Sequence, residues 1–220
     1  MVRQTINRSF WIFPAALLVL PSVLRARKTL SQARIVQLSY VKGTVSILRP
    51  GSPEWSDAAP GTPIQQGFEL RTSAGSYAEV EFENGSIASL GQLSEIGFSE
   101  LAMDSEGNKL NRLDFQQGYA TFSFRPEHRD RWEVEGKSAT LVPDGNCKFR
   151  TDFDHGRLRV EVFKGSLNAS DVSGSLHVGK DVVTEFGQGS TTSQLRRRAA
   201  KDACDKWAQS RNPRELWIGG

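Results

Sequence analysis

Two stretches decide the fold of this chain, VKGTVSIL at residues 41–48 and GFELRTSAGSYAEVEFENGSIASL at residues 67–90. Within residues 77–83, the apolar Ala78, Val80 and Phe82 alternate with glutamates, which is the period-2 pattern of a strand with one buried face. Asn84-Gly85 follows this run and tolerates the positive φ angles of a tight hairpin turn. We therefore expect residues 87–90 to return as a second strand.

The same alternation recurs along the rest of the chain. Residues 157–162 alternate apolar side chains with Arg157, Arg159 and Glu161, which we expect to point outward. Further alternating runs lie at residues 110–115 and 120–124, and turn-forming residues at 143–145 and 154–156. Strands therefore arrive every ~8–12 residues without a long helix between them. This spacing predicts an all-β fold and argues against a parallel doubly wound sheet.

Glycine-containing motifs follow one another in a characteristic order. GFELRT at residues 67–72 fits the pattern G-x-x-L-x-T, DFQQGYA at residues 114–120 contains Gly118, and VFKGSL at residues 162–167 contains Gly165. With VKGTVS at the start of the module, their order and spacing resemble the FecR domain, a family named for a regulator of iron-dicitrate transport. The resemblance spans roughly residues 36–190.

The resemblance implies a compact all-β module on the outer side of a bacterial inner membrane, which we expect to be solenoid-like. A β-sandwich is the alternative, because both architectures use short strands, glycine-rich turns and one buried face. Full sensors of the family place a cytoplasmic segment that binds a sigma factor, and a membrane span, before this module. Only residues 1–9 precede the first apolar run here, so we expect no anti-sigma segment.

Residues 1–33 have the pattern of an export signal. Arg3 and Arg8 precede an apolar run at residues 10–24, and polar residues follow it. The run is shorter than the about 20 apolar residues of a membrane helix, and two prolines interrupt it. We expect cleavage, best after Ala33, and a location in the periplasm or cell envelope. An uncleaved anchor in the inner membrane, with the module facing the periplasm, is the alternative.

The net charge depends on this segment. The full chain carries +3, but residues 1–33 hold five of the 28 basic residues and no acidic one, so the remainder carries −2. The basic run at residues 196–198 is expected to be a solvated helix face, because acidic residues follow it and no aromatic platform is interleaved. We therefore expect no nucleic acid partner.

The composition changes sharply at residues 194–211, which predict a C-terminal helix. Leu195, Ala199, Ala203 and Trp207 recur every four residues on one stripe. We expect this stripe to dock on the β-module and cover an exposed strand edge; binding a partner is the alternative role. Residues 212–220 form a tail. The helix also resembles a D-x-F-D-x-W ending of stand-alone exported FecR-domain proteins, with a cysteine in place of the aromatic residue.

The two cysteines, Cys147 and Cys204, leave two interpretations open. Two buried, unpaired thiols are slightly preferred. A disulfide would suit an oxidising compartment and would pin the C-terminal helix to the β-module.

The candidate interaction residues are aromatic and acidic. Trp55 and Trp132 lie in polar neighbourhoods, where tryptophan can stack on sugar rings or fill a partner's pocket, although core positions are commoner. Glu79, Glu81 and Glu83 share one strand face at about 7 Å spacing. That spacing lies within the range of glycosidase carboxylates, but a solvated strand face explains it better.

Catalytic motifs are missing from the sequence. The histidines at 128, 155 and 177 stand far apart, and the chain has no H-x-x-x-H, G-x-S-x-G or phosphate-loop motif. Asp152, Asp154 and His155 are expected to form a polar turn rather than a metal site. The sequence predicts a protein that is not an enzyme and needs no metal or cofactor.

Two functional hypotheses remain. The first is an exported, signalling-related FecR-domain module that binds an envelope protein or an envelope polymer. The second is an envelope carbohydrate-active or glycan-binding protein that presents aromatic rings and carboxylates to a polysaccharide.

Overall fold

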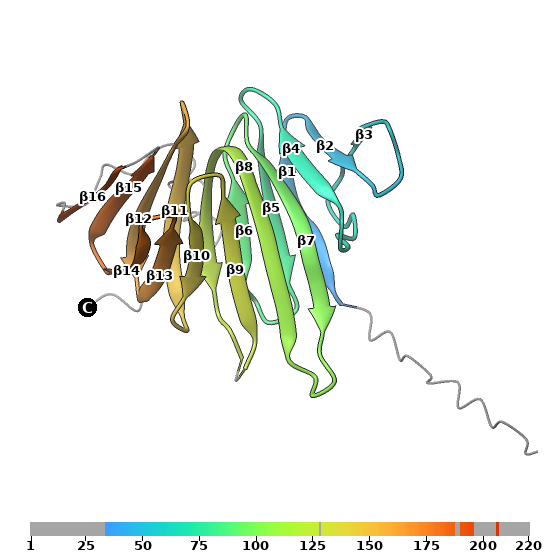
Figure 1. The fold of residues 1–220 in the computed structure, drawn as a ribbon. Coiled ribbons are helices and arrows are strands. Elements are labelled where there is room, and N and C mark those ends of the chain that lie inside the picture. The colour runs from blue at the N-terminus through green and yellow to red at the C-terminus, as the bar shows by residue number, and fades with distance from the viewer. Residues whose placement is uncertain (1–33, 128, 188–189, 196–205, 207–220) are drawn as a thin grey trace, which may run out of the picture. The chain divides into compact units, whose positions relative to one another are not determined.

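The computed structural model describes residues 34–127, 129–187, 190–195 and 206. Sixteen strands run through these residues, and the all-β prediction is confirmed; Lys206 alone has a helical backbone. The strands form two sheets that share the long strand β8 (Lys109–Phe124), as Figure 1 shows.

Sheet A has β8 in its middle and runs from β1 to β16. Its other strands, in spatial order, are β1 (Val36–Lys42), β5 (Tyr77–Phe82), β6 (Ile87–Leu90), β11 (Cys147–Asp154), β12 (Arg157–Lys164), β15 (Val182–Gly187) and β16 (Ser190–Leu195).

Sheet B runs from β3 to β14 and also includes β8. Its other strands, in spatial order, are β3 (Ser56–Asp57), β2 (Val45–Leu48), β4 (Glu69–Thr72), β7 (Glu95–Met103), β9 (Arg131–Gly136), β10 (Thr140–Pro143), β13 (Ser166–Asp171) and β14 (Gly174–Gly179). The β8–β9 pair is parallel, whereas the other strand pairs of the described residues are antiparallel.

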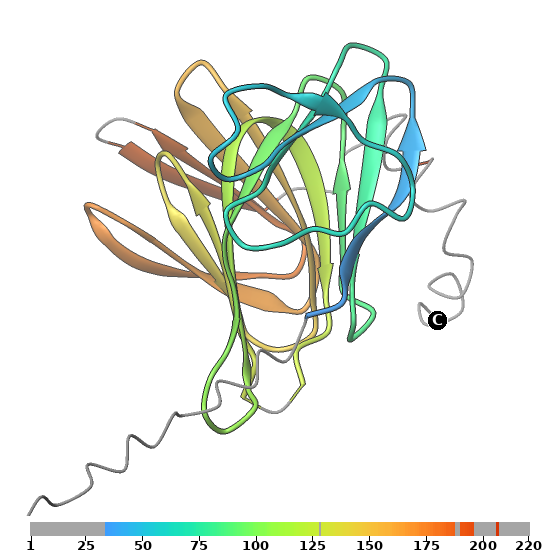
Figure 2. The same ribbon diagram turned by 90° about the vertical axis from the view of Figure 1, so that its right-hand side faces the viewer.

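The two sheets pack face to face around one hydrophobic core, and Figure 2 shows the layers from the side. Phe82 of sheet A meets the edge of Trp132 of sheet B at 4.8 Å between ring centroids, and Phe124 stacks on the same indole at 4.2 Å. The arrangement fits the sandwich alternative, and the solenoid-like arrangement is not confirmed. Seven of the fifteen pairs of successive strands in the described residues are antiparallel neighbours, and these pairs occur in both sheets.

β8 changes sheets at Gly118. Gln117 still pairs with Glu95 of β7, whereas Gly118 already pairs with Phe153 of β11. Gly118 has φ +81°, and a Cβ placed there would lie 2.5 Å from the carbonyl oxygen of Leu93. Only glycine can adopt this positive φ and leave room for the Leu93 carbonyl oxygen without strain.

The predicted hairpin at residues 77–90 is confirmed. Ala78, Val80 and Phe82 are buried on one side of β5, and β6 returns antiparallel to it. The positive φ falls on Gly85 alone, at +74°, while the Asn84 side chain accepts a hydrogen bond from the Ser86 amide at 3.0 Å. The turn is therefore a three-residue loop closed by a glycine in the left-handed region.

The predicted domain boundaries change at the C-terminal end. Gln194 and Leu195, expected to begin a helix, pair with Val183 and Val182 as part of β16. The β-domain thus extends to Leu195, because hydrogen bonding to β15 overrides the helical periodicity of these two residues. The predicted signal segment at residues 1–33, and the rest of the predicted helix and tail apart from Lys206, lie outside the described residues. Among the described residues, no helix has the length and apolar character to cross a membrane.

We predict that Gly118→Ala destabilises the fold more than Gly145→Ala does. Both glycines have positive φ, at +81° and +86°, but nothing lies within 4 Å of a Cβ at residue 145. The control should lose about 1–2 kcal/mol from left-handed strain, and Gly118→Ala roughly 2 kcal/mol more from overlap with backbone atoms. Urea midpoints at constant m-value measure both losses. Equal losses would contradict the role assigned to the sheet change.

Candidate interaction surfaces

The two candidate tryptophans have different environments. Trp132 is 3% exposed and belongs to the core between the sheets, so it offers no surface to a partner in this structure. Trp55 is half-buried just before β3, and the Arg71 guanidinium lies over its ring at 4.1 Å from the centroid. Of the two, only Trp55 keeps the position expected of an interaction residue.

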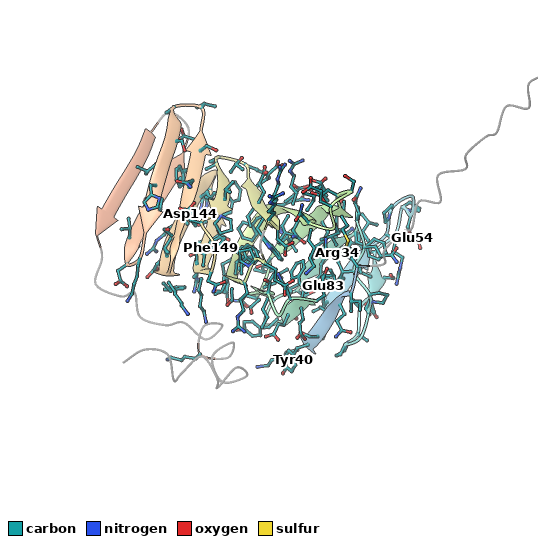
Figure 3. All side chains as sticks on the ribbon, turned by 90° about the horizontal axis from the view of Figure 1, so that it is seen from below. Arg34, Tyr40, Glu54, Glu83, Asp144 and Phe149 are labelled. Atoms are coloured by element: carbon teal, nitrogen blue, oxygen red, sulfur yellow. The ribbon has the colours of Figure 1, made fainter. Side chains whose placement is uncertain are left out.

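The three candidate glutamates do not form one cluster. Glu81 is exposed, and Glu79 is half-buried and accepts a hydrogen bond from the Ser39 hydroxyl at 3.2 Å. The Glu83 side chain is only 17% exposed and forms an ion pair with Arg34. Figure 3 labels Arg34 and Glu83, which lie at the same end of the β1–β5 pair, just beyond the paired residues Val36 and Phe82.

Arg34 is the ion-pair partner of the Glu83 carboxylate. The Arg34 side chain is 6% exposed and also donates hydrogen bonds to the Ala102 carbonyl at 2.8 Å and to the Asn111 side chain at 2.7 Å. These contacts tie the start of the described chain to β7 and β8. Glu83 therefore has a structural role, and its carboxylate is not available to a ligand.

The outer face of sheet A carries all three tyrosines of the chain. This tyrosine face comprises the outward residues of β1, β5, β6, β8, β11, β12 and β15, and includes Tyr40, Tyr77 and Tyr119. The Tyr119 ring lies over Gly91, where a Cβ would come within 2.1 Å of it. The Arg150 guanidinium also lies over that ring, 4.6 Å from its centroid. Glycine and arginine thus hold the tyrosine flat on the sheet.

The outer face of sheet B is acidic and centred on Arg112. This acidic face is Arg112 with six carboxylates on β4, β7, β8 and β9: Glu69, Glu95, Glu100, Asp114, Glu133 and Glu135. The Arg112 Nε lies 3.2 Å from a Glu135 oxygen and 3.5 Å from a Glu133 oxygen, and its Nη1 lies 4.0 Å from Glu100. One guanidinium therefore serves three carboxylates.

Among these acids, Glu135 has a shifted pKa. Burial raises the pKa of the Glu135 carboxyl, and a hydrogen bond with Glu133 and the charge of Asp114 raise it further, against the opposing effect of Arg112. The charge of Glu133, followed by those of Glu135 and Glu100, raises the pKa of Arg112 against the opposing effect of burial. A cationic group from a partner, such as a lysine or arginine side chain, would relieve this excess of negative charge.

Sequence reasoning did not find the acidic face. The alternating acids at residues 133 and 135 are the signal that could have indicated it. The sequence does not show, however, that this strand pairs in parallel with β8, which brings Glu133 beside Arg112. Among the described residues, no group of histidine, cysteine, aspartate or glutamate side chains is arranged to hold a metal ion.

The histidines do not form a catalytic arrangement in the described residues. His177 Nδ1 lies 3.3 Å from Asp144, and the Ser166 hydroxyl donates to the same carboxylate at 3.2 Å. Asp144 thus lies between serine and histidine, whereas a catalytic triad needs the histidine between the other two. His155 is exposed beside Asp154, Asp152 pairs with Arg150, and His128 lies outside the described residues.

Cys147 is a free thiol that is 3% exposed. Burial raises its pKa to about 12, with a smaller effect from the charge of Asp144. The thiolate is therefore scarce at neutral pH, and the residue is unsuited to nucleophilic chemistry. Cys204, the other half of the alternative disulfide, lies outside the described residues.

The motif residues that suggested the family have structural roles. Leu70 is fully buried, and the Thr72 hydroxyl donates to the Gly91 carbonyl at 2.5 Å and accepts from the Ser94 amide at 2.9 Å. A Cβ on Gly165 would lie 2.3 Å from the Asn146 carbonyl oxygen. These residues define turns and strand contacts, which makes the motif a signature of the fold.

These features define an all-β module with two contrasting outer faces. The family model described as FecR protein matches residues 68–168, so the sequence prediction is confirmed and the chain carries a FecR domain.

Two solved structures show the same fold. They are crystal structures, at 2.50 Å and 1.65 Å resolution, of a "putative anti-sigma factor" from Parabacteroides distasonis ATCC 8503. Each superposes with a TM-score of 0.50 and 12% identity, covering 58% of this chain and 59% of that chain. The match thus spans about three fifths of the Parabacteroides distasonis protein and shows the fold alone. No curated protein matches this chain.

We predict that Glu135→Gln stabilises the protein at pH 7 and not at low pH. The folded state raises the pKa of this carboxyl, so ionising it as pH rises through the pKa of the unfolded state lowers the free energy of unfolding. Since the Glu135 side chain is 43% exposed, we expect the gain at about pH 7 to stay below about 1 kcal/mol. Urea denaturation at neutral and acidic pH measures it. The exposed Glu81→Gln is the control, and a loss of stability at pH 7 in Glu135→Gln would contradict the crowding.

Proposed function

We propose that this chain is an exported, signalling-related FecR-domain module that binds a protein partner of the cell envelope and has no enzymatic activity. The FecR domain and the fold likeness to the Parabacteroides distasonis protein support a regulatory role. The pattern of the first 33 residues supports export to the periplasm or envelope. Transmission of a signal to the cytoplasm would then need a separate membrane-spanning partner.

The observation that carries the proposal is the crowding of carboxylates around Arg112. Glu133 and Glu135 keep side-chain exposures of 29% and 43%, so a partner can reach them. The charge excess selects a segment rich in lysine or arginine, and complementary charge speeds encounter as well as adding affinity. The partner is therefore expected to present a basic surface.

Glycan binding is the second candidate, and Trp55 is the observation that favours it. Its indole lies at the surface, held by Arg71 of sheet B. An aromatic ring fixed in this way can stack on the apolar face of a sugar.

We predict that reversing charge on the acidic face removes the protein partner. In cells, chemical crosslinking of the double variant Asp114→Lys with Glu135→Lys should recover the partner at least about tenfold less well, since like charges then meet across the contact. The control, Glu81→Lys with Glu185→Lys, makes the same charge change on exposed residues of sheet A and should leave recovery unchanged.

Equal recovery with both double variants would contradict the assigned surface. Retention of the protein on isolated peptidoglycan or soluble polysaccharide, lost in Trp55→Ala, would support the glycan-binding alternative instead.

We predict that the protein in its native envelope begins at Arg34. The contacts of Arg34 with Glu83, Ala102 and Asn111 tie this residue, which directly follows the expected cleavage site, to the β-module and support this start. Cell fractionation with N-terminal sequencing should give this start in the soluble periplasmic fraction. An intact Met1 in the inner-membrane fraction would instead establish the anchored alternative.

A further inference from the structure

The outer face of sheet A is more buried than a solvated sheet face should be. Ser89, Thr121 and Glu161 point outward in one row across β6, β8, β11 and β12, yet they are only 4%, 5% and 7% exposed. Glu161 points outward as the sequence predicted, but it is buried there. On the outer face of sheet B, by contrast, the Arg112 and Glu135 side chains are each 43% exposed.

Apolar residues on the tyrosine face show the same burial. Val183 points outward beside Glu161 and is 4% exposed, yet it lies outside the hydrophobic core cluster. Ile87 and Phe163 are half-buried and also lie outside that cluster. Because the sheet separates these side chains from the core, they are covered by other atoms on the outer side of the sheet.

The tyrosine face also carries a charged side chain, Arg159, whose hydrogen-bonding atoms are partly buried. The Arg159 Nε and Nη2 atoms are buried and have no hydrogen-bond partner among the described residues. The Arg159 Nη2 atom lies 3.7 Å from a Glu161 carboxylate oxygen, which is an ion-pair distance but too long for a hydrogen bond. The Arg159 side chain is 31% exposed as a whole, but its two buried nitrogens need a carboxylate or carbonyl oxygen as hydrogen-bond acceptor.

The chain itself supplies a segment in the right place. β16 ends at Leu195 on the edge of sheet A, and 25 further residues follow it. Residues 196–211 as a helix would be about 24 Å long, enough to cross about five strands at about 4.8 Å spacing. Their sequence combines an Ala199, Ala203 and Trp207 stripe with charges of both signs, matching the apolar and charged residues of the face.

We propose that residues 196–220 fold back over the tyrosine face, with the Ala199, Ala203 and Trp207 stripe packed against Val183 and its apolar neighbours. The segment covers the face of sheet A, not the strand edge expected from the sequence. Cys147 points into the core on the other side of the sheet, so a segment in this position keeps Cys204 away from it. The inference is independent of the partner proposed for the acidic face.

Zero-length crosslinking of the full chain tests the proposal. A carbodiimide joins lysines to carboxylates in contact, and peptide mapping of the monomer identifies the pairs. Lys201 and Lys206 should crosslink to acids of the tyrosine face, namely Glu79, Glu81, Glu161 or Glu185. Lys109 and Glu127, whose charged atoms lie 2.8 Å apart, are the internal control.

Crosslinks of Lys201 and Lys206 to the acidic face, or none while the control pair reacts, would overturn the proposal. Hydroxyl-radical labelling gives a second measurement in the full chain. Trp207→Ala should raise the labelling of Tyr77 and Tyr119 about twofold or more, since removing a buried apolar side chain loosens the contact. Trp55→Ala, on sheet B, should leave it unchanged, and unchanged labelling in both variants would also overturn the proposal.

Discussion

The structure depends on one continuous strand that belongs to two sheets. The first part of β8 pairs with β7 and β9, and its second part pairs with β6 and β11. A strand that changes partners in this way bends sharply. At Gly118 the strand passes close to Leu93 and Ser94, and glycine leaves room for their atoms because it has no side chain. The same bend brings Phe122 and Phe124 of sheet A against the aromatic residues of sheet B, so the core and the strand crossing depend on each other.

This arrangement leaves the module with two outer faces that differ in character. The face of sheet B is polar and exposed, with carboxylates gathered around one arginine. The face of sheet A has outward side chains with core-like burial. A sandwich needs only its inner faces to be apolar, so the apolar residues outside the core cluster on sheet A point to a second layer of packing. The two faces can therefore serve different roles.

The sequence predicted individual elements better than their assembly. The alternation at residues 77–82 identified both the strand and its buried face, because period-2 patterns report which side chains share a side. The same pattern cannot say which strands become neighbours, so the parallel β8–β9 pair and the acidic face around Arg112 were not predictable. Trp132 was misleading for a related reason: its sequence neighbours Arg131 and Glu133 are polar, but its spatial neighbours bury it.

The acidic face is better explained by binding than by stability. Exposed ion pairs contribute little to stability, typically about 0–1 kcal/mol, so the contacts of Arg112 do not account for six carboxylates on one face. The raised pKa of Glu135, caused first by burial and then by Glu133 and Asp114, indicates that its ionised form is disfavoured in the folded protein, so this carboxylate lowers the stability of the free module at neutral pH. By contrast, the motif glycines and Thr72 stabilise turns and strand contacts. A surface carboxylate that lowers stability, together with motif residues that maintain the fold, is the distribution expected when the fold is a scaffold and function resides on its faces.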